Sequence, residues 1–402
     1  MSFAEAGKIT LKEAGEKMCV SYRQAIRGEG VKGLIHGNRG RSPGNRISEE
    51  IREQILGLSQ GDYQAFNDTH FTEQLKEREG IELSREAGIQ PKRRRRPRKH
   101  RKRRERRPQE GIMVLWDGSP HPWFGREHPP CCLLASMDDA TGKILAGRFF
   151  PFEGSEGYLW LLQKMVRTYG IPVSVYQDRH GALHRNDTYW SLEEQLAGRR
   201  DPTQVGLALE ALGIHSIFAL SPEAKGRIEQ LFGTLQDRLG AELTLAGITD
   251  ILAANAFLPA FINRFNGRFA VPPMEDQQAW RTVPKNLDLD RIISFRYMAT
   301  VGKDNTVRLG GLVLDIPPGP GKRSYAKAKV EVRQLLDGSW RIYYQDRLIA
   351  KHPSTTLQKP IRALAKQRSP VKGAKSYDWI YQASSPYGRR SGRVIIFDQP
   401  GT

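Results

Sequence analysis

Cysteine is scarce in this 402-residue chain, which has Cys19, Cys131 and Cys132 and no Cys-x-x-Cys pair. A disulfide framework and a zinc ribbon are therefore both disfavoured, and the composition fits a reducing compartment. Long apolar runs are missing too, because no stretch approaches the roughly 18 residues that a membrane helix needs. The opening stretch MSFAEAGKITLKEAGEKM lacks the hydrophobic core of a secretory signal. We therefore expect a cytoplasmic protein that neither crosses a membrane nor is secreted.

Acidic residues are also few compared with basic ones. The chain has 44 Asp and Glu against 63 Lys and Arg, a formal net charge of +19, which indicates a polyanionic partner and first of all nucleic acid. The segment 92–107, KRRRRPRKHRKRRERR, holds 13 basic residues and one acid, so it repels itself and buries no apolar surface. We predict a basic linker over 92–109 that follows DNA phosphates; a solvated tail or a localisation signal is the alternative. The expected contacts are Arg93, Arg94, Arg95 and Arg96.

Two helical units are predicted before this linker. Residues 9–27, ITLKEAGEKMCVSYRQAIR, show the pattern of two short helices with a break between them. That pattern is typical of a helix-turn-helix unit and predicts one over 1–45, although a generic helical hairpin would look the same. The second helix would bring three side chains to the base edges, namely Tyr22, Arg23 and Gln24.

The second helical unit is predicted over 46–91. Ser48 has the position of an N-cap residue before an apolar helical pattern. The first helix would carry Ile51, Ile55 and Leu58 on one face, and in the next stretch Phe71, Leu75 and Ile81 would pack.

From Ile112 onward the pattern is that of strands. The runs IMVLWD, CCLLASMD and KILAGRFF are apolar and β-prone and are separated by proline or turn residues, which predicts three consecutive strands. A helix from Ser155 to about Gly170 follows, and then the strand VSVYQD. Strands that alternate with helices predict a mixed α/β sheet covered by helices over 110–275.

Short strands return beyond Pro284. RIISFRYMATV, TVRLGGLVLDI, AKVEVRQLL and SWRIYYQDRLIAKH follow each other at close intervals. This spacing predicts a small β-barrel over 285–352. The last stretch, 353–402, becomes rich in Ser, Gly, Arg and Pro, and we expect a flexible tail.

Three carboxylates stand where this layout would bring acids together. Asp117 ends the first strand of the core, Asp178 ends the fourth, and Glu229 lies in the helix that follows Ser221. Acids on neighbouring strand ends, with one more on a covering helix, are the oxygen ligands that two divalent metal ions require. The simpler readings are that a strand-end acid caps a loop, and that Glu229 pairs with Lys225 one turn earlier.

Other polar groups nearby have ordinary explanations. Asp138 and Asp139 lie at a hairpin, where Asp is a common turn former. Glu223 lies in a first helical turn, where an acid favours the helix dipole. The stretch HPWFGREHPPCC has two His and two Cys but no recognised ligand spacing, so no zinc is expected.

The stretches WDGSPHPWFG, MDDATGKILAGRFFP, QDRH and SPEAKGRIEQLFGTLQDRL resemble bacterial insertion-sequence transposases of the ISNCY type. That type belongs with retroviral integrases in the DDE, ribonuclease H-like superfamily. The resemblance is close over about 112–273, partial in the helix-turn-helix region and weak in the barrel. It places the family's three acids on Asp117 in WDGS, Asp178 in QDRH and Glu229 in AKGRIEQLF. The interval of 51 residues between the last two exceeds the superfamily's usual one, so HRNDTYWSLEEQLAGRRDPTQ would be an insertion.

The resemblance implies phosphoryl transfer on DNA. The enzyme would cut at insertion-element ends and transfer the strands into target DNA, with two Mg²⁺ or Mn²⁺ ions held by the three acids. It also implies a homo-oligomer on double-stranded DNA, associated with the bacterial nucleoid. Lys225 and Arg227 would face DNA beside the metals. His180 would contact a phosphate or assist proton transfer, unless it is merely hydrogen-bonded at the strand end.

Two rival functions remain open. One is a non-catalytic helix-turn-helix DNA-binding protein or a degenerate transposase copy, and the other is a simple nuclease. The presence of all three acids argues against the first, and the apparent DNA-reading units on both sides of the core argue against the second. However, Gly28 and Gly30 end the first recognition helix early, and ELSREAGIQP leaves a stub of the second. We therefore expect weak discrimination between element ends and other DNA.

Overall fold

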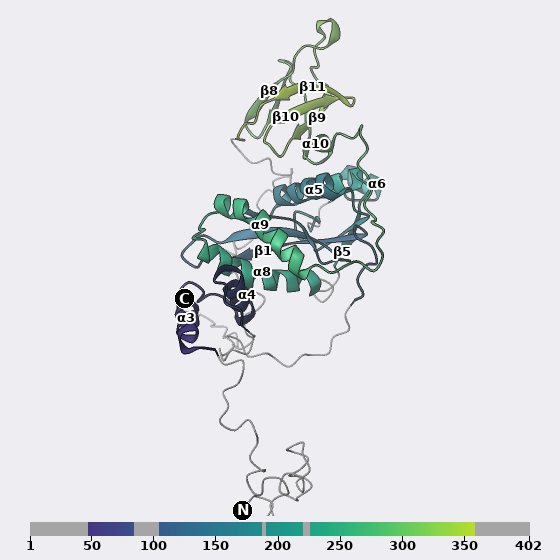
Figure 1. Cartoon of the computed structure of the whole chain (residues 1–402). Coiled ribbons are helices and arrows are strands. Elements are labelled where there is room, and N and C mark those ends of the chain that lie inside the picture. The colour runs from purple at the N-terminus through teal and green to yellow at the C-terminus, as the bar shows by residue number, and fades with distance from the viewer. Residues whose placement is uncertain (1–46, 84–103, 187–189, 220–225, 358–402) are drawn as a thin grey trace, which may run out of the picture. The chain divides into compact units, whose positions relative to one another are not determined.

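The computed structural model describes residues 47–83, 104–186, 190–219 and 226–357 (Figure 1). The chain divides into two compact units, 1–295 and 296–402, and each is described by itself. Several predictions fall outside the described residues and stay predictions. They concern the first helix-turn-helix unit with Tyr22, Arg23 and Gln24, the linker residues Arg93, Arg94, Arg95 and Arg96, Lys225, Glu223 and most of the tail.

The first unit is built around one five-stranded sheet. Its strands are β1 (Met113–His121), β2 (Cys131–Asp138), β3 (Ile144–Phe150), β4 (Ser174–Gln177) and β5 (His215–Phe218). They lie in the order β3-β2-β1-β4-β5, in which β1, β2 and β3 are antiparallel neighbours and β4 and β5 run parallel to β1. The antiparallel strands need only short turns, whereas β4, which pairs parallel with β1, is reached from β3 through the helix α5 (Ser155–Tyr169). The predicted mixed α/β core is confirmed.

Helices cover both faces of this sheet. Trp116 of β1 lies against Tyr158 of α5, with ring centroids 5.5 Å apart, so one face of β1 packs on α5. On the opposite face, Leu115 joins a core with α8 (Gly226–Leu245) and α9 (Ile251–Phe269). Every residue of β2 is buried because both of its faces are covered (Figure 1). No helix in the described part of the chain is long and apolar enough to span a membrane.

Helix α9 also closes the outer edge of the sheet at β3. Asn266 accepts from the backbone N–H of Ile144 and donates to its carbonyl oxygen, both at 2.8 Å. Asn255 does the same at Phe149, at 2.8 and 3.0 Å. These amides satisfy backbone groups that an edge strand otherwise leaves open.

The connection from β4 to β5 contains the predicted insertion. It carries α6 (Leu192–Ala197), which begins with a capping box, and α7 (Gln204–Ala211), which packs against α5. Arg185 pairs with Glu194 of the capping box, and the Arg200 guanidinium lies 5.2 Å from the centre of the Trp190 ring. The stretch is therefore held by its own charges and caps.

Two helices precede the sheet, α3 (Glu49–Gln60) and α4 (Asp68–Arg78). Ser48, as predicted, and Asn67 are their N-caps, and each side-chain oxygen accepts a backbone hydrogen bond from the first turn. On the predicted apolar face of α3, Ile55 is buried and Leu58 partly buried, whereas Ile51 is 40% exposed because this helix buries only a narrow stripe. The predicted packing is confirmed for Phe71 and Leu75, and in part for Ile81.

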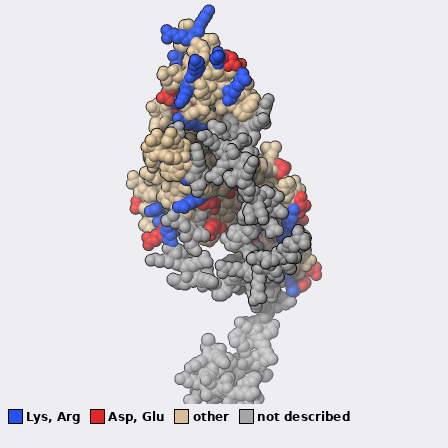
Figure 2. Space-filling view, turned by 180° about the vertical axis from the view of Figure 1, so that it is seen from behind, with Lys and Arg blue, Asp and Glu red and all other residues tan. Residues whose placement is uncertain are grey.

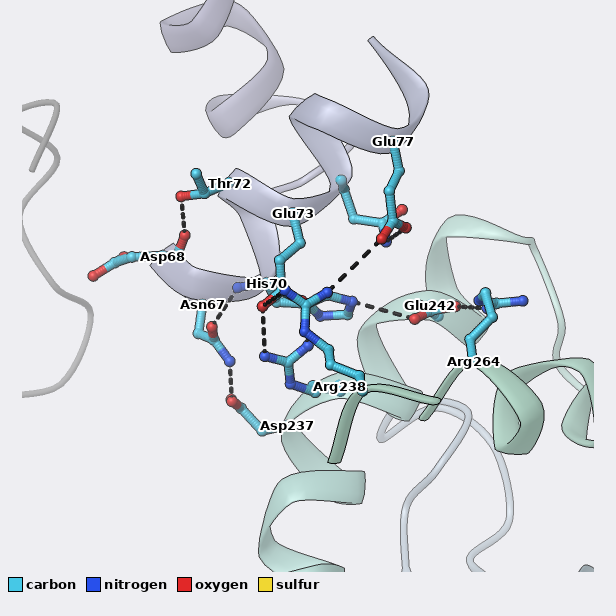
Figure 3. A network of polar contacts seen from close by, with 12 residues as sticks. Asn67, Asp68, His70, Thr72, Glu73, Glu77, Asp237, Arg238, Glu242 and Arg264 are labelled. Atoms are coloured by element: carbon cyan, nitrogen blue, oxygen red, sulfur yellow. Dashed lines mark hydrogen bonds and ion pairs between the residues drawn. The ribbon is translucent and has the colours of Figure 1, made fainter. Parts of the chain in front are cut away.

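Charged side chains fasten α4 to α8 and α9 (Figure 3). His70 Nε2 lies 3.2 Å from Glu242 Oε1, and Arg264 pairs with the other oxygen of Glu242 at 2.5 Å. Arg238 donates two hydrogen bonds to Glu73, at 2.5 and 3.1 Å. Burial raises the pKa of Glu242, but the hydrogen bonds and charges of His70 and Arg264 outweigh burial and lower it. Because His70 and Glu242 are both buried, each depends on its partner.

The second unit consists of strands. A four-stranded sheet of order β11-β10-β9-β6 stands beside a separate two-stranded ribbon, β7 (Thr306–Leu309) and β8 (Leu312–Asp315). The sheet is formed by β6 (Phe295–Thr300), β9 (Lys329–Gln334), β10 (Trp340–Tyr344) and β11 (Arg347–His352).

The predicted barrel is wrong as a closed structure, since in residues 296–357 no backbone ladder joins the ribbon to the sheet. Gly310 and Gly311 both have positive φ and form the tight turn that pairs β7 with β8. The ribbon then packs on the sheet through side chains, with Val307 in one core with Val332 and Trp340.

Candidate active site

The register of two parallel strands brings Asp117 and Asp178 side by side. Leu115 of β1 is aligned with Tyr176 of β4, and one residue further Trp116 Nε1 donates to Gln177 Oε1 at 2.8 Å. Asp117 lies two residues after Leu115 within β1, Asp178 lies two residues after Tyr176 and directly follows β4, and both are half-buried. Aligned residues of parallel strands point to the same face of the sheet. That face is the one covered by α8, because Leu115 and Tyr176 pack in its core.

The backbone orients both carboxylates. Oδ1 of Asp117 accepts a hydrogen bond from the N–H of Gly118 at 3.0 Å. Oδ1 of Asp178 accepts from the N–H of His180 at 2.9 Å, which folds the residues after β4 into a tight turn.

Glu229 lies on α8, over the same face of the sheet. Ile228 packs in the core beside Leu115, whereas Glu229 is exposed. Gln236, two turns further along the helix, donates to Ser119 Oγ of β1 at 3.0 Å, so this side of α8 borders β1. Glu229 makes no hydrogen bond or ion pair with another residue that the structure describes.

The structure thus brings the two aspartates together and places the glutamate on the covering helix without a contact to either. Within the described ranges, no three His, Cys, Asp or Glu side chains are close enough together to hold a metal ion.

Sequence reasoning missed Glu153, which lies just before α5. Tyr158 OH donates to Glu153 Oε1 at 2.6 Å, and His180 Nδ1 lies 3.5 Å from the same oxygen. A Cβ on Gly118 would collide with the Glu153 carboxylate, so the glycine after Asp117 leaves the space that this acid fills. The only sequence signal was Gly118, directly after Asp117. A glycine can leave space for another side chain, but it does not show that Glu153 fills that space.

The raised pKa values of Tyr158 and Cys132 indicate negative charge near these carboxylates. The pKa of Tyr158 is raised well above its usual value, first by burial, then by Glu153, and further by Asp117 and Asp178. Burial, followed by the charges of Glu153 and Asp117, raises the pKa of the Cys132 thiol to about 12. A site where carboxylates gather in this way attracts hard cations.

Asp138, the last residue of β2, and Asp139, in the turn that follows, have structural roles. Asp138 is fully buried and accepts from the N–H of Gly111 and from the N–H and hydroxyl of Thr141, at 2.8 to 3.0 Å. Asp139 is also buried and pairs with Arg104 and Arg227. Arg227, predicted to contact DNA, is therefore bound to an acid in this structure.

Comparison with known proteins identifies relatives. No family model matches the chain. The "Putative transposase y4bF" of Sinorhizobium fredii is 35% identical over 300 residues, which cover 71% of this chain and 64% of that protein, so the chain spans less than two thirds of its length. The transposase for insertion sequence IS1202 of Streptococcus pneumoniae is 30% identical over 394 residues, covering 85% of this chain and 82% of that protein.

Solved structures that match belong to viral integrases. A simian T-cell lymphotropic virus intasome in complex with PP2A regulatory subunit B56 gamma matches with 14% identity over 68% of this chain and 85% of that one, at a TM-score of 0.32. The HTLV-2 integrase catalytic core in complex with magnesium matches with 15% identity over 39% and 82%, at a TM-score of 0.26.

Proposed function

Since the chain belongs to the transposase family, we propose that it cuts DNA at the ends of an insertion element and joins the freed ends to target DNA. The observation that carries the proposal is the position of two acids on adjacent parallel strands: Asp117 lies in β1, and Asp178 directly follows β4. Glu229 lies on the helix that covers the same face. These are the positions to which the family's acidic motif points.

The chemistry of these residues fits divalent metal ions. Carboxylate oxygens are the preferred ligands of Mg²⁺ and Mn²⁺, and the raised pKa values of Tyr158 and Cys132 indicate negative charge beside them. Asp117, Asp178 and Glu229 would hold two ions, whose chemistry when bound is to lower the pKa of water or of a 3′-hydroxyl and to offset the charge of the phosphate. The backbone N–H groups of Gly118 and His180 orient the two aspartates.

DNA would be bound through phosphates by two basic regions. The first is the linker over 92–109. The second is the C-terminal unit, whose residues 296–357 carry 11 Lys and Arg against 5 Asp and Glu, and blue side chains outnumber red ones on the face seen in Figure 2. Contacts of this kind give affinity without reading sequence. We expect two or more copies to hold a pair of element ends.

The test uses the purified full chain, a labelled duplex that carries an element end, and Mg²⁺. We expect nicking at the element boundary and joined products with target DNA, both lost in Asp117→Asn and Asp178→Asn while duplex binding stays. Binding without cleavage by the unaltered chain would instead favour the DNA-binding rival. Cleavage that ignores the element boundary would favour a simple nuclease.

A further inference from the structure

Asp139, in the turn between β2 and β3, gathers three separate parts of the chain. Its carboxylate is fully buried. Arg104 donates to both of its oxygens, at 2.5 and 3.2 Å, and the backbone N–H of Arg107 donates at 2.9 Å. Arg227, in the first turn of α8, donates at 2.5 Å. One acid therefore joins the end of the basic linker to the start of α8.

Further contacts tighten the same junction. The Arg106 guanidinium donates to the carbonyl oxygens of Asp139 and Ala140, at 3.2 Å each. Arg227 also donates to the carbonyl oxygen of Arg104, which links the linker to α8 directly. The turn itself is rigid, because buried Asp138 binds its backbone. A buried carboxylate on a rigid turn is stable only while guanidinium groups compensate its charge.

We propose that Asp139 is a positioning residue that clamps the basic linker to the first turn of α8. Glu229 follows Arg227 by two residues, so the clamp sets where the helix carrying this acid begins relative to the sheet. The clamp also keeps Arg104 and Arg227 away from DNA phosphates. The catalytic consequence rests on the proposed function, whereas the clamp itself does not.

The primary variant is Asp139→Asn, and its matched control is Asp276→Asn, which makes the same change at an exposed position. Three measurements compare them in the full chain. The first is the rate of trypsin cleavage after Arg104 and Arg106, since Pro108 protects the bond after Arg107. The second is binding of a duplex without element sequence at several salt concentrations. The third is cleavage of an element end.

Loss of the clamp should raise the rate of trypsin cleavage at least about tenfold, a change equivalent to 1.4 kcal/mol. It should free two arginines for phosphates, which tightens duplex binding at low salt and steepens the log-log salt slope by about 1 to 2. Cleavage of the element end should fall about tenfold despite the tighter binding. If trypsin rate and salt slope match those of Asp276→Asn, the clamp is refuted.

A second variant covers the case in which Asp139→Asn does not fold. Arg104→Gln removes one arm of the clamp, lies partly at the surface and leaves Asp139 paired with Arg227. It should still raise trypsin cleavage after Arg106 several-fold; an unchanged rate would overturn the proposal. The trypsin and salt-slope measurements do not depend on catalysis. If the parent protein is inactive, the proposed function is refuted, and these two measurements still test the clamp.

Discussion

The two halves of α8 use charge in opposite ways. In the C-terminal half, Arg238 and Glu242 are bound to partners from α4 and α9, and Asp237 accepts a hydrogen bond from Asn67 (Figure 3). In the first turn, Glu229 is exposed and bonds to no residue that the structure describes. A buried charge is retained only with a partner, so the charges of the C-terminal half stabilise the fold. For Glu229 we predict a role in chemistry instead.

Changing the acids proposed for chemistry should produce the largest effect. Asp117→Asn, Asp178→Asn and Glu229→Gln should each lower the rate of DNA cleavage by on the order of a thousandfold or more, because each removes a metal ligand worth several kcal/mol to the transition state. Duplex affinity and melting temperature should stay close to those of the parent. Rate assays with purified variants measure this. A variant that keeps its activity removes that residue from the site and breaks the contrast at α8.

In the C-terminal half of α8, a change at Glu242 should lower stability and leave activity unchanged. Glu242→Ala leaves His70 and Arg264 without their buried partner, so unfolding should become easier by about 3 to 5 kcal/mol. Urea denaturation followed by circular dichroism measures the change. Cleavage per folded molecule should be unchanged. A stable Glu242→Ala protein would mean that the network in Figure 3 contributes nothing to the fold.

Stability measured over a pH series tests the same role of Glu242. The pKa of Glu242 is lowered in the folded protein from an ordinary value of 4.5, so the ionised form is favoured by folding. Its contribution to stability is present above pH 4.5 and is lost as pH falls through the lower, folded-state pKa. Glu242→Gln should therefore flatten the acid side of the stability profile. A parent and variant that lose stability in parallel would contradict the assignment.

Neutralising arginines of the linker should lower DNA affinity and its salt dependence, an effect of intermediate size. Replacement of Arg93, Arg94, Arg95 and Arg96 by Gln removes up to four phosphate contacts and should flatten the log-log salt slope by up to about 3.6, at about 0.9 per contact. Affinity should fall equally for element ends and unrelated duplexes, as measured by competition binding. A loss confined to element ends would mean that this arm reads sequence.

The smallest effect is expected at Glu153. Glu153→Gln keeps an acceptor for Tyr158 but removes the charge beside His180, so the turn that carries Asp178 should be held less firmly. Cleavage should drop about tenfold, which is 1.4 kcal/mol, with little change in melting temperature. Because Glu153 Oε1 lies 3.5 Å from His180 Nδ1, removal of its charge should also shift the pH dependence of cleavage. An unchanged profile would make Glu153 part of the packing around α5.

The sequence predicted elements whose causes are local. Alternating apolar strands, the helix after Ser155 and the N-cap Ser48 each depend on a few neighbouring residues, and the structure has all three. Asp117 was expected at the end of the first strand, but that is wrong, because β1 continues to His121 and the acid lies within the strand. Asp178 directly follows β4. Whether Glu229 completes the site stays a prediction.

What escaped prediction depends on partners far along the chain. Glu153 reaches Gly118 across the sheet, and Asp139 meets Arg227 from 88 residues away. No local pattern signals such meetings. The barrel failed for a related reason, because strand periodicity reports that strands exist but not which edges pair, and a Gly-Gly turn commits β7 to β8.

The asparagines of α9 have a consequence for how copies of this protein can meet. The free backbone of an edge strand is a template on which another molecule can add a strand, and such β-augmentation drives both intended pairing and aggregation. Asn255 and Asn266 already bond the backbone of Ile144 and Phe149, so that template is occupied from within. At this edge, recognition between copies must therefore proceed through side-chain surfaces, which can discriminate among partners as backbone pairing cannot.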